Sequence, residues 1–239
     1  GEYFLFAAEG GTIFTHQEVV ARSKSLDAKS FVVEPDGPIL TNFDTPNSYL
    51  QKQGHGALVN TPGGEWYYAS LTARPWNHDN ESATDPRGWS TLGRETSLQK
   101  VYWDEQGWPR VEGGHGGKTF VDAPKDAIET EAPADHSQHD DFVSEKLDLN
   151  WNTLRVPFTE KMGTTGNGSL KLIGQGSLAN PFDLSLIARR WQAFYFDAET
   201  KVKFDPYSYQ AMAGLTNYYN HSHWSWIFVT KNDEGAPVI

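Results

Sequence analysis

The fold is decided by a stretch that opens Gln51-Lys-Gln-Gly-His-Gly56, continues Thr61-Pro-Gly-Gly-Glu-Trp-Tyr-Tyr-Ala-Ser-Leu-Thr-Ala-Arg-Pro75, and closes Leu92-Gly-Arg-Glu-Thr96. A Pro-Gly-Gly turn followed by an aromatic, half-alternating run predicts a turn that leads into a β-strand. Glycine beside a polar residue lets backbone or a ligand approach closely. The glycines beside His55 and Arg94 therefore single out these two side chains, which we expect the fold to bring together.

The strand pattern of this stretch has an earlier copy. Gly1-Glu2 precedes an aromatic run at Tyr3 as Gly64-Glu65 precedes one at Trp66, so the two copies lie 63 residues apart. Short strands that repeat at a fixed period are typical of β-propeller blades. Further strands are predicted at 18–23, 31–34, 97–102 and 108–111, each bounded by turn residues.

The second half of the chain begins with a change of composition. Glycines at 113–117 and the Pro-, Ala-, Asp- and Glu-rich residues after them predict a linker over 115–140. Strand patterns return at 152–157, 170–173, 184–188, 191–196, 211–219 and 224–230, with a further strand opening at 237–239; this spacing is typical of a sandwich or barrel. The predicted class is all-β, with one domain over 1–114 and a β-sandwich over 141–239, both truncated.

Composition excludes several classes of function. The formal net charge of −11 argues against nucleic acid and anionic membranes as partners. The chain has no cysteine, which excludes disulfides and thiolate chemistry, and no apolar run reaches the roughly 18 residues of a membrane span. Asn-x-Ser sequons at Asn80, Asn167 and Asn220 agree with secretion, the expected localisation; a cytoplasmic location is the alternative.

Nine motifs connect the chain to a known family. Seven occur in the family's order: Ala8-Glu-Gly-Gly-Thr12, Val20-Ala-Arg-Ser23, Pro38-Ile-Leu-Thr41, Gln51-Lys-Gln-Gly-His-Gly56, Gly64-Glu-Trp-Tyr67, Leu92-Gly-Arg-Glu-Thr96 and Gly107-Trp-Pro109. In these the sequence resembles the β-xylosidases of glycoside hydrolase family 43. Two more, Asn150-Trp-Asn-Thr-Leu-Arg155 and Ser185-Leu-Ile-Ala-Arg-Arg190, resemble the family's C-terminal sandwich.

The resemblance implies a five-bladed propeller with an exo-acting pocket, followed by a jelly-roll, lectin-like sandwich. It implies inverting hydrolysis of terminal β-1,4-linked xylose from xylo-oligosaccharides or arabinoxylan fragments, often with α-L-arabinofuranosides as further substrates. The family's base Asp, a second Asp and the acid Glu of a Glu-Gly-Pro-His motif all fall upstream of Gly1. We therefore expect about three later blades, no established catalytic residue in this chain, and a missing N-terminal propeller segment as its partner.

The candidate site residues come from the same motifs. The candidate substrate-binding residues are Thr12, His55 and Arg94. Thr12 matches a family position near the sugar, with plain turn chemistry as the alternative; the resemblance places His55 on the propeller axis beneath the pocket, and Arg94 is expected to line the pocket. The planar fork of Arg94 can donate to sugar hydroxyls and hold a carboxylate ionised, although a salt bridge between blades is the alternative. Glu95 is expected to support Arg94 or the backbone. Glu9 is a weak candidate for the acid, against a turn carboxylate bonded to backbone amides.

Three further expectations complete this interpretation. The chemistry needs no cofactor; calcium bound to His55 through water is left open, although one imidazole is a poor site for this cation. Trp66, Trp103 and Trp108 are expected in the core rather than as sugar platforms. The rival function is a carbohydrate-binding or interaction module without hydrolysis, and a homo-oligomer is left open.

Overall fold

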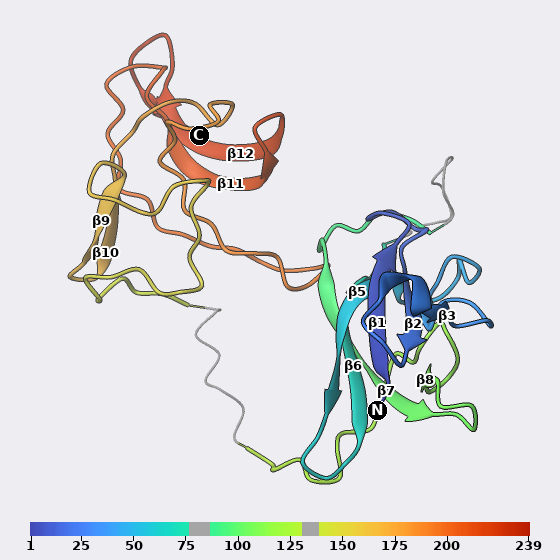
Figure 1. Cartoon of the computed structure of the whole chain (residues 1–239). Helices are drawn as coiled ribbons and strands as arrows, with labels where there is room; N and C mark the ends of the chain where they lie inside the picture. The colour runs from blue at the N-terminus through green and yellow to red at the C-terminus, as the bar shows by residue number, and fades with distance from the viewer. Residues whose placement is uncertain (77–86, 131–138) are drawn as a thin grey trace. The chain divides into compact units, whose positions relative to one another are not determined.

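The structure, a computed structural model, describes residues 1–76, 87–130 and 139–239 (Figure 1). The chain forms two compact units, Gly1–Glu131 and Ala132–Ile239, and the division falls within the stretch 115–140 that the sequence predicts as a linker. In the described ranges the only helix is the 3-10 turn η1 (Ala28–Ser30), and no helix has the length and hydropathy to span a membrane. The chain is all-β, as predicted, while the domain bounds at 114 and 141 stay predictions.

The first sheet of the N-terminal unit contains β1 (Tyr3–Glu9), β2 (Gln17–Ser23), β3 (Val32–Val33) and β4 (Leu40–Thr41). β1 and β2 are antiparallel, and the other edge of β2 pairs with both β3 and β4. Side chains alternate between the two faces of a strand. In and just before β2 the buried face carries His16, Glu18 and Val20, so two polar side chains lie where apolar ones are the norm.

The second sheet contains β5 (Gln51–Asn60), β6 (Trp66–Ala73), β7 (Glu95–Trp103) and β8 (Pro109–Val111). These strands pair in chain order, each antiparallel to the next, which is the form of a propeller blade. The predicted repeat is confirmed, because β1 and β6 each begin two residues after its glycine. The described part of this unit forms two sheets rather than about three, since the strand expected at 31–34 joins the edge of β2.

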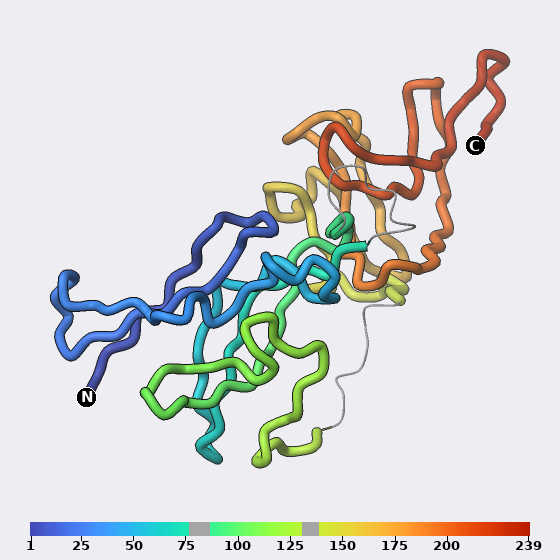
Figure 2. Tube along the Cα trace, turned by 90° about the vertical axis from the view of Figure 1, so that its right-hand side faces the viewer, coloured from blue at the N-terminus to red at the C-terminus, as the bar shows by residue number. Residues whose placement is uncertain are grey.

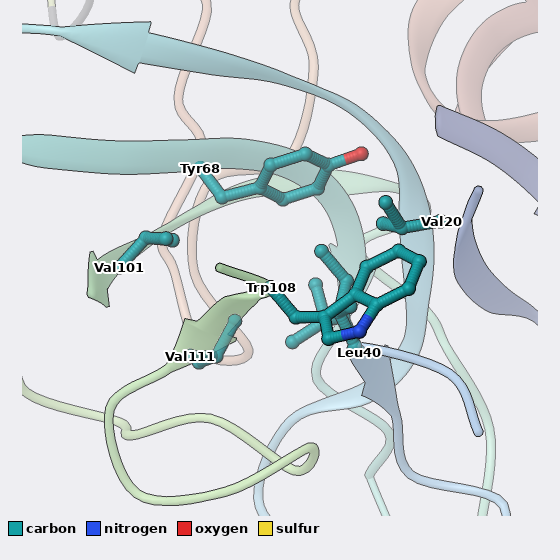
Figure 3. Close-up of a cluster of buried hydrophobic side chains, with 7 residues drawn as sticks. Val20, Leu40, Tyr68, Val101, Trp108 and Val111 are labelled. Atoms are coloured by element: carbon teal, nitrogen blue, oxygen red, sulfur yellow. The ribbon is translucent and has the colours of Figure 1, made fainter. Parts of the chain in front are cut away.

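One hydrophobic cluster joins the two sheets, and Figure 3 shows its side chains converging. Its buried members are Val20, Ile39, Leu40, Tyr68, Val101, Trp108 and Val111. Around it, the rings of Trp66 and Trp103 lie edge to face with centroids 5.6 Å apart, and Phe4 contacts Trp103 at 5.0 Å. The three tryptophans therefore pack in and around the core, as expected, since large rings bury much apolar area in such contacts.

The first part of the predicted linker lies on the N-terminal unit. The Tyr67 hydroxyl donates to the carbonyl of Asp122 at 2.9 Å, and the Lys125 amide donates to Glu65 Oε2 at 2.6 Å. Lys100 Nζ donates to Glu65 Oε1 at 2.7 Å. The Lys100 ammonium, followed by the Lys125 amide, lowers the pKa of Glu65. This carboxylate therefore connects the linker to β7 of the second sheet.

The C-terminal unit contains β9 (Gly163–Gly166), β10 (Ser169–Leu172), β11 (Ala213–Asn220), β12 (His223–Lys231) and β13 (Pro237–Val238). β9 pairs with β10, and β11, β12 and β13 form an antiparallel sheet. Its core contains Leu178, Leu184 and Leu186, with Tyr218 and Trp226 packed against it. The strands predicted at 170–173, 211–219, 224–230 and 237–239 are confirmed to within a few residues.

Three other strand predictions in this unit are wrong. Residues 152–157, 184–188 and 191–196 form no strand; only an isolated bridge joins Asn152 to Ala188. The chain between β10 and β11 is otherwise irregular in both views (Figures 1 and 2). Leu184 and Leu186, on either side of Ser185, are both buried in the core. Such alternation reports burial of one face, whereas a strand also needs a paired neighbour.

Candidate functional site

The candidate site lies on a distorted part of β5. The pairing of β5 with β6 shifts register between Gln51 and Gly54 and again between Gly54 and Ala57. Within this segment Lys52 has φ 55° and His55 has φ 54°. A positive φ is uncommon for residues with a side chain and recurs at functional sites. His55 is exposed on this distorted segment.

The glycines on either side of His55 accommodate neighbouring protein atoms. A Cβ on Gly54 would lie 2.9 Å from the carbonyl oxygen of Gln17 and from the ring of His16. A Cβ on Gly56 would lie 2.3 Å from the carbonyl oxygen of Ala69. The sequence left open whether backbone or a ligand approaches these glycines. The atoms that approach them in the structure are backbone and side-chain atoms of the protein itself.

A buried carboxylate of the first sheet reaches the same segment. The backbone amide of His55 donates to Glu18 Oε2 at 2.6 Å, and Glu18 is only 2% exposed. The Tyr68 side chain lies beside this carboxylate. Burial first, and then the neighbouring Glu18, raise the pKa of Tyr68 well above its ordinary value. Tyr68 is therefore a neutral phenol at any physiological pH.

Arg94 meets β5 from the turn before β7. Its Nη2 donates to the carbonyl of Lys52 at 3.2 Å. Its Nε is buried without a hydrogen-bond partner in the described part of the chain, and burial lowers the pKa of the guanidinium. No salt bridge of Arg94 occurs among the described residues, so they do not form the ion pair that was the alternative to a pocket role. His55 and Arg94 thus both meet the distorted segment of β5.

Glu95 does not support Arg94, contrary to expectation. Its carboxylate accepts from Arg74 Nε at 2.8 Å (Oε2) and 3.1 Å (Oε1), and from Arg74 Nη2 at 2.6 Å (Oε1). Arg74 Nη1 also donates to the Tyr49 hydroxyl at 2.9 Å. Successive residues of a strand point to opposite faces, and Glu95 begins β7 opposite Thr72 of β6. It therefore lies beside Arg74, two residues beyond Thr72, rather than beside its chain neighbour Arg94.

Glu9 and Thr12 lie at the end of the β1–β2 hairpin. Glu9 is exposed and accepts from Gln17 Nε2 at 2.9 Å, opposite which it pairs in the sheet. The carboxylate thus binds a side-chain amide across the hairpin, in place of the backbone amides that were the alternative to catalysis. Thr12 lies in the exposed turn. Its contact with a sugar stays a prediction.

A directly bound metal does not fit the described residues. They contain no group of three or more His, Asp or Glu side chains arranged to hold a metal ion. His55 offers one imidazole. The Glu18 carboxylate that reaches this residue already accepts a hydrogen bond from the His55 amide. Calcium prefers six or more oxygen ligands, which this arrangement does not supply.

The sequence analysis missed Glu18 and His16. Both occupy the buried face of β2, where His16 has neither ring nitrogen hydrogen-bonded in the described structure. The signal was present in the run His16-Gln-Glu-Val-Val20, where polar residues alternate in register with the buried Val20. A titratable residue at an expected core position of a strand is informative because burial is costly without a partner.

Comparison with known proteins settles the family. Residues 1–109 match the model for glycosyl hydrolases family 43, and residues 139–239 match that for the β-xylosidase C-terminal concanavalin A-like domain. The chain belongs to glycoside hydrolase family 43. The resemblance stated from nine motifs is thereby confirmed, and with it the class of fold: part of a propeller followed by a sandwich domain.

Individual relatives agree with this assignment. A Bacillus subtilis β-xylosidase is 44% identical over 99% of this chain and 44% of its own length. A Bacteroides ovatus non-reducing end α-L-arabinofuranosidase is 32% identical over 99% of this chain and 43% of its own. The crystal structure of a Bacillus halodurans xylan β-1,4-xylosidase superposes with a TM-score of 0.85 at 38% identity, over 99% of this chain and 44% of that one. The chain therefore spans less than half the length of each of these relatives.

Proposed function

We propose that this family 43 chain is part of a glycosidase that releases terminal β-1,4-linked xylose from xylo-oligosaccharides with inversion of the anomeric carbon. Terminal α-L-arabinofuranose is the second substrate class to be tested. The names of three relatives support the proposal: one is a β-xylosidase, one a xylosidase/arabinosidase and one an α-L-arabinofuranosidase. Arabinoxylan fragments would then carry both kinds of terminal sugar.

One observation carries the assignment of the site: Arg94 is a half-buried guanidinium without a carboxylate partner in the described structure. A fixed guanidinium that has lost water needs acceptors, and its planar fork suits paired oxygens. Neighbouring hydroxyls of a sugar are such acceptors. Because Arg94 bonds to β5 close to the exposed His55, we propose that the two side chains contact the same terminal sugar.

The carboxylates around this site are already engaged, which bears on catalysis. Glu9 accepts from Gln17, Glu18 accepts from the His55 amide, and Glu95 pairs with Arg74. Inverting hydrolysis needs one carboxylic acid and one carboxylate about 6.5–9.5 Å apart with room for water. We therefore propose that the acid and base lie on an N-terminal propeller segment outside residues 1–239, and that these residues alone do not hydrolyse glycosides.

The rival function is sugar binding without hydrolysis, and the same engaged carboxylates favour it for the chain alone. Isothermal titration of xylobiose against the full-length protein and against residues 1–239 separates the two. The rival would be established if residues 1–239 bind xylobiose as tightly as the full-length protein does and the full-length protein shows no turnover.

Calcium at His55 is a proposal for water-mediated binding only, and titration of calcium against the wild type and His55→Ala tests it.

The proposed reaction has a direct assay. Proton NMR of 4-nitrophenyl β-D-xyloside hydrolysis by the full-length protein should show α-xylose as the first sugar released, because inversion at a β-linkage gives the α-anomer and this substrate releases only one xylose. Initial release of β-xylose would refute inversion, and no release from either xylosides or arabinofuranosides would refute the glycosidase proposal.

Secretion and self-association are also proposals. Fractionation of the culture tests secretion, and sedimentation tests self-association.

A further inference from the structure

The burial of Glu18 needs an explanation. Its side chain lies on the inner face of β2 and is almost fully buried, yet the described residues offer it no cationic partner. Burying a carboxylate without a counter-charge is unfavourable unless hydrogen bonds compensate. In the described structure Glu18 Oε2 accepts a hydrogen bond from the amide of His55 at 2.6 Å, and the neutral phenol of Tyr68 lies beside the same carboxylate. Both groups compensate for the burial of Glu18, and of the two only the His55 amide belongs to the candidate site.

A second buried carboxylate on the same sheet shows the ordinary solution. Glu34 is 3% exposed, and its Oε1 accepts from Arg110 Nη2 at 2.8 Å. The charge of Glu34 is thus balanced by a guanidinium, as is usual for buried acids. Glu18 and Glu34 differ in partner rather than in burial, which makes Glu34 a matched control for Glu18.

The amide of His55 needs an acceptor from outside its own sheet. His55 falls between Gly54, opposite Leu71, and Ala57, opposite Ala69, where the ladder to β6 shifts register. Its backbone is in the left-handed region at φ 54°. This conformation is unfavourable for a residue with a Cβ unless its surroundings hold it. The carboxylate of Glu18 supplies a charge-assisted bond at this point, and the ring of His16 packs against Gly54 beside it.

We propose that Glu18 is a positioning residue: its carboxylate fixes the left-handed backbone of His55 and thereby the orientation in which the His55 imidazole meets the sugar. The inference rests on the proposed function, since it gives His55 a ligand. The device links two sheets. The carboxylate comes from β2 and the histidine from β5, and the glycines on either side of the histidine are packed too closely to carry a side chain.

The test uses the full-length protein with the variants Glu18→Ala, Glu18→Gln and Glu34→Gln. Loss of a charge-assisted bond corresponds to about tenfold in an equilibrium or rate constant. We expect Glu18→Ala to lower kcat/KM on 4-nitrophenyl β-D-xyloside about tenfold in the folded fraction. Glu18→Gln keeps an acceptor oxygen and should lose less, about threefold. Glu34→Gln should change kcat/KM less than about twofold, whatever it does to stability.

Two readouts separate positioning from a general loss of stability. In a His55→Ala background, Glu18→Ala should cost less than about twofold, because its effect passes through His55. An equal loss in both backgrounds would overturn the proposal. The His55 amide proton should resonate far downfield in the wild type and move upfield in Glu18→Ala; an unmoved signal would also overturn it. The amide readout needs no turnover, so it decides on Glu18 even if the protein proves not to be a glycosidase or if His55→Ala has no measurable rate.

Discussion

Substitution of Gly56 by alanine should destabilise the N-terminal unit more than any ordinary surface change. The added Cβ would lie 2.3 Å from the carbonyl oxygen of Ala69, 2.6 Å from Cε1 of Tyr68 and 2.8 Å from Cβ of Ser70, well short of the 3.4 Å at which ordinary contact begins. Ala69 O belongs to the paired strand β6 and cannot rotate away. Gly56 does not have a positive φ, so the penalty is steric alone.

The size of this penalty follows from the rigidity of the obstacle. Overpacking a closely packed site typically costs about 1–3 kcal/mol, and a backbone obstacle places Gly56→Ala near 3 kcal/mol. The assay is urea unfolding of the full-length protein followed by tryptophan fluorescence, since Trp66, Trp103 and Trp108 report on this unit. Gly174→Ala is the control, because nothing lies within 4 Å of its added Cβ. A loss for Gly56→Ala no larger than the control's would refute the reasoning.

Two further predictions concern ion pairs of the N-terminal unit. Arg74→Gln should lower the free energy of unfolding by about 1 kcal/mol, because a two-point bond to a partly exposed carboxylate is lost; urea unfolding in low and high salt checks it, and a loss that does not shrink in salt would contradict it. Lys100 and the Lys125 amide lower the pKa of Glu65, so the stability that Glu65 contributes is complete above the ordinary carboxyl pKa and is lost as the pH falls through the lowered one. Glu65→Gln should therefore flatten the acid side of the stability–pH curve and expose the chain near Lys125 to proteases; an unchanged acid limb would refute this.

The sequence predicted the sheets of the N-terminal unit because their signals are local. Turn residues and β-branched or aromatic runs placed β2, β6, β7 and β8 near their observed bounds, and the repeated Gly-Glu-aromatic pattern placed β1. Strands at 184–188 and 191–196 were predicted from the same kind of run and are absent. A strand exists only with a paired neighbour, and no local pattern says which neighbour the fold provides.

The site was predictable only in part. Glycines marked His55 and Arg94, and both indeed meet one segment of β5. The partner of Glu95 could not be predicted, because Arg74 comes beside it only through the pairing of β6 with β7. The role of Glu18 depends on contact between strands of two different sheets. Short motifs do not predict contacts between residues that are distant in the sequence.

We propose that Arg94 binds sugar rather than holding the fold together. This proposal is tested most directly by measuring kcat/KM and the melting temperature on the same full-length samples of Arg94→Ala and Arg94→Lys. Among the described residues Arg94 makes a single hydrogen bond, to the Lys52 carbonyl, so both melting temperatures should stay close to that of the wild type. Loss of a charge-assisted bond to substrate should lower kcat/KM about 10–100-fold for alanine. Lysine keeps the charge without the planar fork and should also lose rate. Lowered melting temperatures with normal kcat/KM per folded molecule would show that Arg94 is structural and would contradict the account.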